Sequence, residues 1–173
     1  SRVVVHVTDV SRNGVNVDER LAHCAGSLRV LARACAHMDV TLLVETPLPH
    51  LIGGHPDEFA SVIRRLDRRV GVCFDTSHAT LGHHWDGFVA VAGDRLMHVH
   101  ANDHRGQFDD HLPPGEGVID WRHIRATLEG LDFNGWIVLE LSCPTAPLPE
   151  YMGGALARAR QLFGMVEESA EVG

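Results

Sequence analysis

The chain has 173 residues, 45% of them hydrophobic, and a formal net charge of −8, which is the composition of one ordinary globular domain. All 15 basic residues are arginines, so enzymes that need a Schiff-base lysine, a pyridoxal-phosphate lysine or a Walker-type phosphate loop are excluded. The acidic balance makes nucleic acid an unfavourable partner. No apolar run approaches the ~20 residues that cross a bilayer. No signal-like segment opens the chain, so we expect a cytoplasmic location and no membrane partner.

Strand and helix patterns alternate along the chain. Runs of β-branched and apolar residues predict strands, and apolar residues at helical spacing predict helices. In chain order we predict strand 2–8, helix 17–37, strand 40–45, helix 56–69, strand 70–74, helix 85–92, strand 96–100, helix 120–129 with Asp120 as N-cap, strand 136–141 and helix 150–168. Loop 46–55 is rich in Pro and Gly, and loop 101–119 is long and polar.

Five strand–helix units with almost continuously apolar strands predict a parallel sheet covered by helices, in a single domain over residues 1–173. Two architectures fit this pattern: an open doubly wound sheet, or part of a (β/α)8 barrel. No GxGxxG fingerprint follows the first strand, which weakens the nucleotide-binding version of the doubly wound sheet. Trp85 and Trp121 open helices, and we expect both in the core.

The chain is rich in histidine, with 13 residues, and its four cysteines (Cys24, Cys35, Cys73 and Cys143) are scattered without a CxxC pair. We expect the cysteines to be buried free thiols. Several histidines stand near Asp or Glu at the ends of predicted strands. This density of imidazole and carboxylate indicates a metal site.

Potential ligands share one position in the strand–helix units. They lie late in a strand or just after it: His6, Glu45, Asp75, His78, His100 and Glu140. Because the carboxyl ends of parallel strands form one rim of the sheet, we expect these side chains to converge there. Mixed carboxylate and imidazole ligands suit divalent Zn, Mn, Fe or Co.

A second group of potential ligands lies in the loop 101–119. Asp109 and His111 are two positions apart, so both can reach one cation if the segment is extended. His78 belongs to the neighbouring loop. The Pro- and Gly-rich stretch 113–117 would hold this segment in place. A DxH pair by itself is equally compatible with a solvated loop.

Four segments, VCFDTSHA (72–79), HVHAND (98–103), DHLPPGEGVIDW (110–121) and VLELS (138–142), resemble the xylose-isomerase-like TIM-barrel superfamily. This group contains sugar-phosphate isomerases and epimerases as well as endonuclease IV-type apurinic/apyrimidinic endonucleases. The resemblance covers essentially the whole chain, with the motifs in the correct order. It implies a (β/α)8 TIM barrel of which this chain supplies about five C-terminal units.

The resemblance also implies roles for individual residues. Glu45, Asp75, His100 and Glu140 match the central metal site of the superfamily. His78, Asp109 and His111 match an additional metal site of the endonuclease-like members, although in the sugar isomerases the histidine at position 78 can contact the substrate. His6 matches an outer metal ligand of the multi-metal members.

The alignment shows a departure from the family pattern. The first strand corresponds to the fourth strand of the barrel, and a complete barrel needs roughly 250 residues. Because the chain begins at Ser1, we expect it to be the C-terminal portion of a longer protein. The alternative is a half-barrel that dimerises.

The resemblance predicts a metal-dependent isomerase or epimerase of a sugar or sugar phosphate, working by ene-diolate proton transfer with Mn²⁺, Zn²⁺, Mg²⁺ or Co²⁺. Glu45 and Glu140 would be the catalytic acid–base pair, and His78 and Arg105 would contact the carbohydrate substrate. The acidic charge and the sequence of the segment DHLPPGEGVIDW favour an isomerase over a DNA repair enzyme. The expected placement of many arginines on helix surfaces favours it too: Arg64, Arg65, Arg68 and Arg69. The alternatives are an endonuclease-like phosphodiesterase, a related lyase or dehydratase, and a non-catalytic binding module. A homo-oligomer is also compatible with the sequence.

Overall fold

A computed structural model describes residues 1–142 and 147–165 of the chain. Five parallel strands pair in the order in which they occur: β1 (Arg2–His6), β2 (Thr41–Glu45), β3 (Gly71–Asp75), β4 (Leu96–Ala101) and β5 (Trp136–Leu139). The helices are α1 (Val17–His37), α2 (Pro56–Ile63), α3 (Thr76–Leu81), α4 (Trp85–Ala92), α5 (Trp121–Gly130) and α6 (Leu148–Leu162), with a 3-10 turn at Gly93–Arg95. No helix of the described ranges is long and apolar enough to span a membrane.

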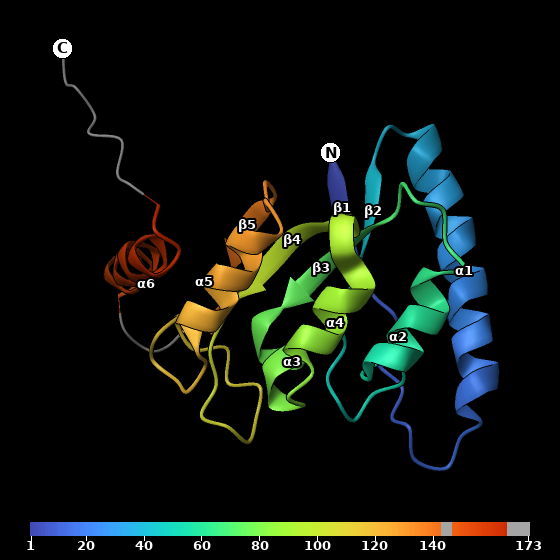
Figure 1. Cartoon of the computed structure of the whole chain (residues 1–173), viewed down its shortest axis with the longest axis horizontal. Coiled ribbons are helices and arrows are strands. Elements are labelled where there is room, and N and C mark those ends of the chain that lie inside the picture. Colours follow the sequence, from blue (N-terminus) through green and yellow to red (C-terminus); the bar gives the residue numbers. More distant parts are fainter. Residues whose placement is uncertain (143–146, 166–173) are drawn as a thin grey trace.

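The strands form a half-barrel with the helices α1 to α5 arranged along one face of the sheet (Figure 1). The uninterrupted order β1-β2-β3-β4-β5 has no reversal point. Since each right-handed crossover then returns on the same face, the doubly wound alternative is wrong. The chain is a partial TIM barrel, as the motifs predicted.

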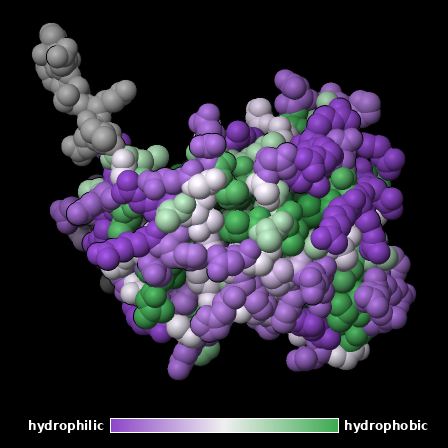
Figure 2. Space-filling model, in the orientation of Figure 1, coloured by the Kyte–Doolittle hydropathy of each residue, from purple (hydrophilic) through white to green (hydrophobic). Residues whose placement is uncertain are grey.

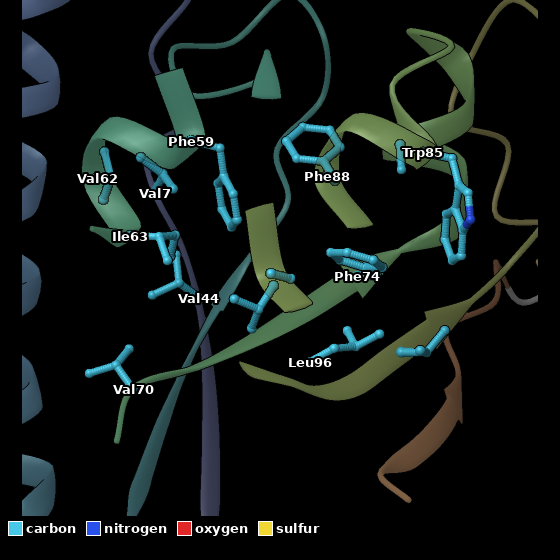
Figure 3. Close-up of a cluster of buried hydrophobic side chains, with 14 of the residues drawn as sticks. Val7, Val44, Phe59, Val62, Ile63, Val70, Phe74, Trp85, Phe88 and Leu96 are labelled. Atoms are coloured by element: carbon cyan, nitrogen blue, oxygen red, sulfur yellow. The ribbon is translucent and has the colours of Figure 1, made fainter. Parts of the chain in front are cut away.

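The core lies between the sheet and its covering helices. Figure 3 shows Phe59 and Phe88, from α2 and α4, above Phe74 of β3. The Phe59 and Phe88 rings meet edge to face at 5.4 Å, and Phe74 meets Trp85 at 5.2 Å. Trp85 and Trp121 are both buried, which confirms their predicted place in the core. Most of the surface in Figure 2 is hydrophilic, with hydrophobic patches between.

The structure corrects the predicted end of one helix. α2 ends at Ile63 and not at residue 69. The buried guanidinium of Arg95 donates hydrogen bonds to the backbone carbonyls of Ile63, Asp67 and Val70 at 2.7–2.9 Å. These carbonyls are directed at one side chain, so the segment after Ile63 forms turns instead of further helix.

Other boundaries also differ from the prediction. The helix α3 falls in a stretch predicted as loop, where the Asp75 carboxylate accepts a hydrogen bond from the backbone N–H of His78 at 2.8 Å and caps the helix. Six residues are too few to show a helical period. The strand β5 ends at Leu139, so Glu140 follows it directly. The last helix ends at Leu162, and residue 168 lies outside the described residues.

The predictions for the cysteines and the surface arginines are met in part. Cys35 and Cys73 are buried free thiols and Cys24 is half-buried, while Cys143 is outside the described residues. The predicted surface arginines are exposed, although they follow α2 instead of lying on it: Arg64, Arg65, Arg68 and Arg69.

The concave face of the sheet carries a different set of side chains from the core face. The strand pairing places His6, Glu45, Cys73, His98 and Trp136 in one row across this face. In the present chain the concave face is open at β5, where Trp136 is 66% exposed. The outer edges of β1 and β5 have no partner strand among the described residues.

Exposed apolar side chains on this face, Trp136 and Val138, together with unpaired strand edges, favour association between chains. We therefore predict that the isolated 173-residue chain self-associates. Trp136→Gln combined with Val138→Thr, both on the open face, should shift the sedimentation profile towards monomer. Val30→Thr is the matched control, because Val30 is exposed on α1 away from this face. A wild-type chain that is monomeric and melts cooperatively would contradict the prediction.

Candidate metal centre

Four ligand-type side chains meet at the carboxyl ends of the strands. Glu45 ends β2, Asp75 ends β3, His100 lies near the end of β4 and Glu140 follows β5. One ligand atom from each residue lies within 4.8 Å of the others. The parallel register produces this convergence. Asp75 pairs with His100, and both lie two residues beyond Cys73 and His98, which are in the same row as Glu45.

The central cluster places several carboxylates around one imidazole. His100 Nδ1 lies 3.1 Å from Glu45 Oε1 and 2.8 Å from Glu140 Oε2. Glu45 and Asp75 are almost fully buried, whereas Glu140 is half exposed. Buried carboxylates need a compensating positive charge. A divalent cation held by these four residues would supply it.

The pKa values of these residues reflect the same excess of buried negative charge. Burial raises the pKa of Asp75. Burial also acts to raise the pKa of Glu45, but hydrogen bonds from His100 and His6 outweigh it and hold this pKa at about 2. Burial acts to lower the pKa of His100, but contacts with Cys73, Glu140 and Glu45 raise it to about 12. A proton on His100 and a bound cation would therefore be alternative sources of positive charge for these carboxylates.

A second cluster forms around Asp109. Its Oδ2 lies 3.1 Å from His78 Nε2 and 3.0 Å from His111 Nε2. The other ring nitrogen of each histidine faces a backbone carbonyl: His78 Nδ1 that of Thr46 at 2.9 Å, and His111 Nδ1 that of Glu140 at 3.0 Å. Nδ1 therefore carries the proton, and in a neutral ring the Nε2 lone pair points at the carboxylate.

Two lone pairs facing a carboxylate are favourable only with added positive charge. Asp109 raises the pKa of His111 to about 9, and the pKa of His78 also reaches about 9 because Asp109 and Asp75 outweigh its burial. Asp109 Oδ1 is buried without a hydrogen-bond partner among the described residues. The cluster therefore fits a cation, and Asp75, His78 and Asp109 also offer ligand atoms within 4.8 Å of one another.

Asp103 holds the loop that carries Asp109 and His111, a role that the sequence analysis missed. It is fully buried, and its carboxylate accepts hydrogen bonds from the backbone N–H groups of Gly115 and Ile119 and from Trp121 Nε1 at 2.9–3.2 Å. A Cβ on Gly117 would collide with this carboxylate. The signal in the sequence was the Asn-Asp pair that follows the strand β4.

Asn102 joins the two clusters and was also missed. Its Nδ2 donates to Asp75 Oδ2 at 2.7 Å and lies 3.4 Å from His111 Nδ1. Its Oδ1 accepts from the backbone N–H of Ser77 at 3.2 Å. This side chain is fully buried and orients one carboxylate of the central cluster.

Two predicted residues lie at the margin of the site. His6 Nε2 is 3.2 Å from Glu45 Oε2, on the β1 side of the central cluster, and this contact raises its pKa to about 9. Arg105 is exposed, and its guanidinium pairs with Asp110 at 3.1 Å. The structure therefore brings His6 to the central cluster. Arg105 lies on the loop, where it pairs with Asp110 and, within the described chain, forms no ion pair with either cluster.

A third group of ligand-type side chains, which was not predicted, lies nearer the amino ends of the strands than the central cluster. Cys73, His98 and His100 each offer a ligand atom within 4.8 Å of the others. Cys73 is fully buried, and burial raises the pKa of its thiol to about 11. Within the described chain, His98 Nδ1 is buried without a hydrogen-bond partner.

Comparison with curated proteins shows two named relatives of different activity. A probable endonuclease 4 of Halobacterium salinarum is 30% identical over 134 residues, and the match covers 67% of this chain and 48% of that protein. An inosose dehydratase of Klebsiella pneumoniae is 30% identical over 105 residues, and the match covers 49% of this chain and 34% of the relative. The chain thus spans less than half the length of these relatives.

Comparison with solved structures shows the same fold. A D-tagatose 3-epimerase-like protein is 23% identical, with a TM-score of 0.79 over 96% of this chain and 63% of its own. The TTHB071 protein from Thermus thermophilus, soaked with ZnCl2, is 26% identical, with a TM-score of 0.67 over 94% of this chain and 61% of its own.

The family comparison covers almost the whole described chain. Residues 1–162 match the family described as xylose isomerase-like TIM barrel. This agrees with the half-barrel and with the convergence of ligand-type side chains at its rim. The chain belongs to the xylose isomerase-like TIM-barrel family.

Proposed function

We propose that the protein is a divalent-metal-dependent isomerase or epimerase of a sugar or sugar phosphate. The observation that carries the proposal is the pair of carboxylates Glu45 and Glu140, whose oxygens lie 3.1 and 2.8 Å from His100 Nδ1. Moving a proton between two carbons, or between two faces of one carbon, needs a base and an acid placed across the substrate. The epimerase-like fold neighbour is consistent with this chemistry.

Glu45, Asp75, His100 and Glu140 would hold the central metal, for which Mn²⁺, Zn²⁺, Mg²⁺ and Co²⁺ are the candidates. When bound, the cation polarises the substrate carbonyl as a Lewis acid and so acidifies the neighbouring C–H bond. His78, Asp109 and His111 would hold a further cation, with His6 as an outer ligand beside Glu45.

The residues of the chain then divide the proton transfer between them. One of Glu45 and Glu140 removes the proton from the carbon next to the carbonyl, and the other returns it. Glu140 is the more exposed of the two and therefore the more accessible to an incoming sugar, while Glu45 is held by His100 and His6. Asn102 fixes Asp75. Arg105 is a proposed contact to substrate hydroxyl or phosphate groups, and such a contact is the alternative role of His78 to that of a metal ligand.

The cluster of His78, Asp109 and His111 favours a second candidate function. Two neighbouring metal sites suit phosphodiester hydrolysis, because they can stabilise both the attacking and the leaving oxygen. The relative named as a probable endonuclease 4 supports this alternative. The acidic charge of the chain opposes it, since DNA affinity depends on clustered cations.

We predict that the Mn²⁺- or Co²⁺-loaded protein washes deuterium from D2O into the α-position of a ketose, free or phosphorylated. Glu140→Gln keeps an oxygen ligand but loses the basic carboxylate. It should therefore slow the exchange by about 100-fold or more while the metal content changes little. Proton NMR of the sugar and elemental analysis of the protein provide the two measurements.

The control for this experiment is Glu129→Gln, which removes an exposed carboxylate paired with Arg125 on α5 and should leave the exchange unchanged. Incision of abasic-site DNA without exchange across a ketose panel would reject the isomerase proposal in favour of phosphodiester hydrolysis.

We also predict more than one bound metal per chain. Asp109→Ala combined with His111→Ala should remove one equivalent, because it deletes the shared carboxylate and one imidazole of the second cluster. The central equivalent should remain, since none of its four ligands changes. Elemental analysis of both proteins after gel filtration gives the count. A single equivalent in both would leave His78 as a substrate contact.

A further inference from the structure

A groove opens at the opposite end of the sheet from the metal clusters. Its lining comes from the C-terminal half of α1, the start of β2 and the segment that joins α2 to β3. Thr41, the first residue of β2, lies in the groove, whereas Glu45, the last residue of β2, belongs to the metal centre. Four residue steps of about 3.3 Å separate the two along the strand, so the groove is a separate site.

Arginines from two segments of the chain form two walls of the groove. Arg29 and Arg33 lie one turn apart on α1, and Arg64, Arg65 and Arg69 come from the segment after α2. In a chain with a net charge of −8, one third of the 15 arginines therefore line one cavity.

Most of this positive charge has no partner in the protein. Arg69 pairs with Asp67 at 3.0 Å. Within residues 1–142 and 147–165, no ion pair or side-chain hydrogen bond engages Arg29, Arg33, Arg64 or Arg65. The carboxylates of Asp39 and Asp67 also line the groove, so they offset only part of the charge of its five arginines. Like charges that line one cavity repel each other, and a bound anion relieves this repulsion. Arginine presents a planar fork of donors that suits phosphate oxygens.

The floor of the groove is apolar. It consists of small and aliphatic side chains from the helix and the strands: Ala32, Ala36, Val40, Leu42, Leu66, Val70 and Met97. The cavity has a volume of about 710 Å³, within the range that encloses a small organic ligand. Inorganic phosphate would fill only a small part of it and would leave the apolar floor uncovered.

We propose that this groove binds an organic phosphate that has an apolar body, with the phosphate held between the two arginine walls and the body on the floor. Nucleotides and alkyl phosphates share this chemistry, so the ligand can come from either source. The site lies outside the proposed catalytic centre and does not depend on the isomerase function.

The test is calorimetric titration of the metal-loaded protein with ADP, octyl phosphate and inorganic pyrophosphate. We expect saturable 1:1 binding of ADP or octyl phosphate, at least about tenfold tighter than that of pyrophosphate, because only the first two cover the floor. Arg33→Glu combined with Arg65→Glu, one residue from each wall, should weaken binding at least about tenfold. Raising the salt concentration should weaken it as well.

Two further variants locate the ligand. Arg68→Glu is the matched control. Arg68 lies between the groove arginines in sequence, but it is exposed, pairs with Asp94 and does not line the cavity. Ligand binding should therefore change little in this variant. Ala36→Trp should fill the apolar floor. It should therefore weaken the binding of the organic phosphate and leave the binding of pyrophosphate unchanged.

The proposal is overturned if neither organic phosphate binds, if pyrophosphate binds as tightly as both, or if Arg68→Glu weakens binding as much as the double variant. Circular dichroism and metal content of each variant, matched to wild type, show that a loss of binding is local. These readouts do not use isomerase activity, so a failure of the proposed function leaves the test intact.

Discussion

The structure depends on one electrostatic constraint: carboxylates are buried at the ends of parallel strands and must meet positive charge there. Glu45 and Asp75 are almost inaccessible to solvent, and each lies beside an imidazole ring, that of His100 for Glu45 and that of His78 for Asp75. Contacts with Cys73, Glu140 and Glu45 raise the pKa of His100 to about 12, and contacts with Glu45 and Asp9 raise that of His6 to about 9, so protonated imidazoles can supply positive charge there. The same need for positive charge is what makes the rim a suitable place for a divalent metal.

The rest of the half-barrel keeps those groups in register. The parallel pairing from β1 to β5 aligns the last residues of the strands, and the aromatic core of Phe59, Phe74 and Phe88 fixes the helices against the sheet. Asp103 anchors the loop that brings Asp109 and His111 to His78. A buried polar network of this kind is stable only because nearly every member has its hydrogen-bond partner.

The two ends of the sheet have opposite electrostatic character. Carboxylates and histidines gather at the carboxyl ends of the strands, whereas unpaired arginines gather around the groove near the amino ends. A strongly acidic chain can therefore still carry a local excess of positive charge. The candidate metal centre and the proposed phosphate site lie on different parts of the molecule, so we expect ligands at the two sites not to compete.

Local patterns in the sequence determined the alternation of strands and helices, the parallel sheet and the position of Glu45, Asp75, His100 and Glu140 at strand ends, because hydrophobic period and strand phase depend only on neighbouring residues. Contacts between distant residues decided the rest. Arg95 ends α2 by binding carbonyls some thirty positions earlier, and Arg105 is paired with Asp110. Which imidazole nitrogen faces Asp109, and which arginines share a groove, follow from the packing of segments that lie far apart in the chain and leave no mark on the local pattern.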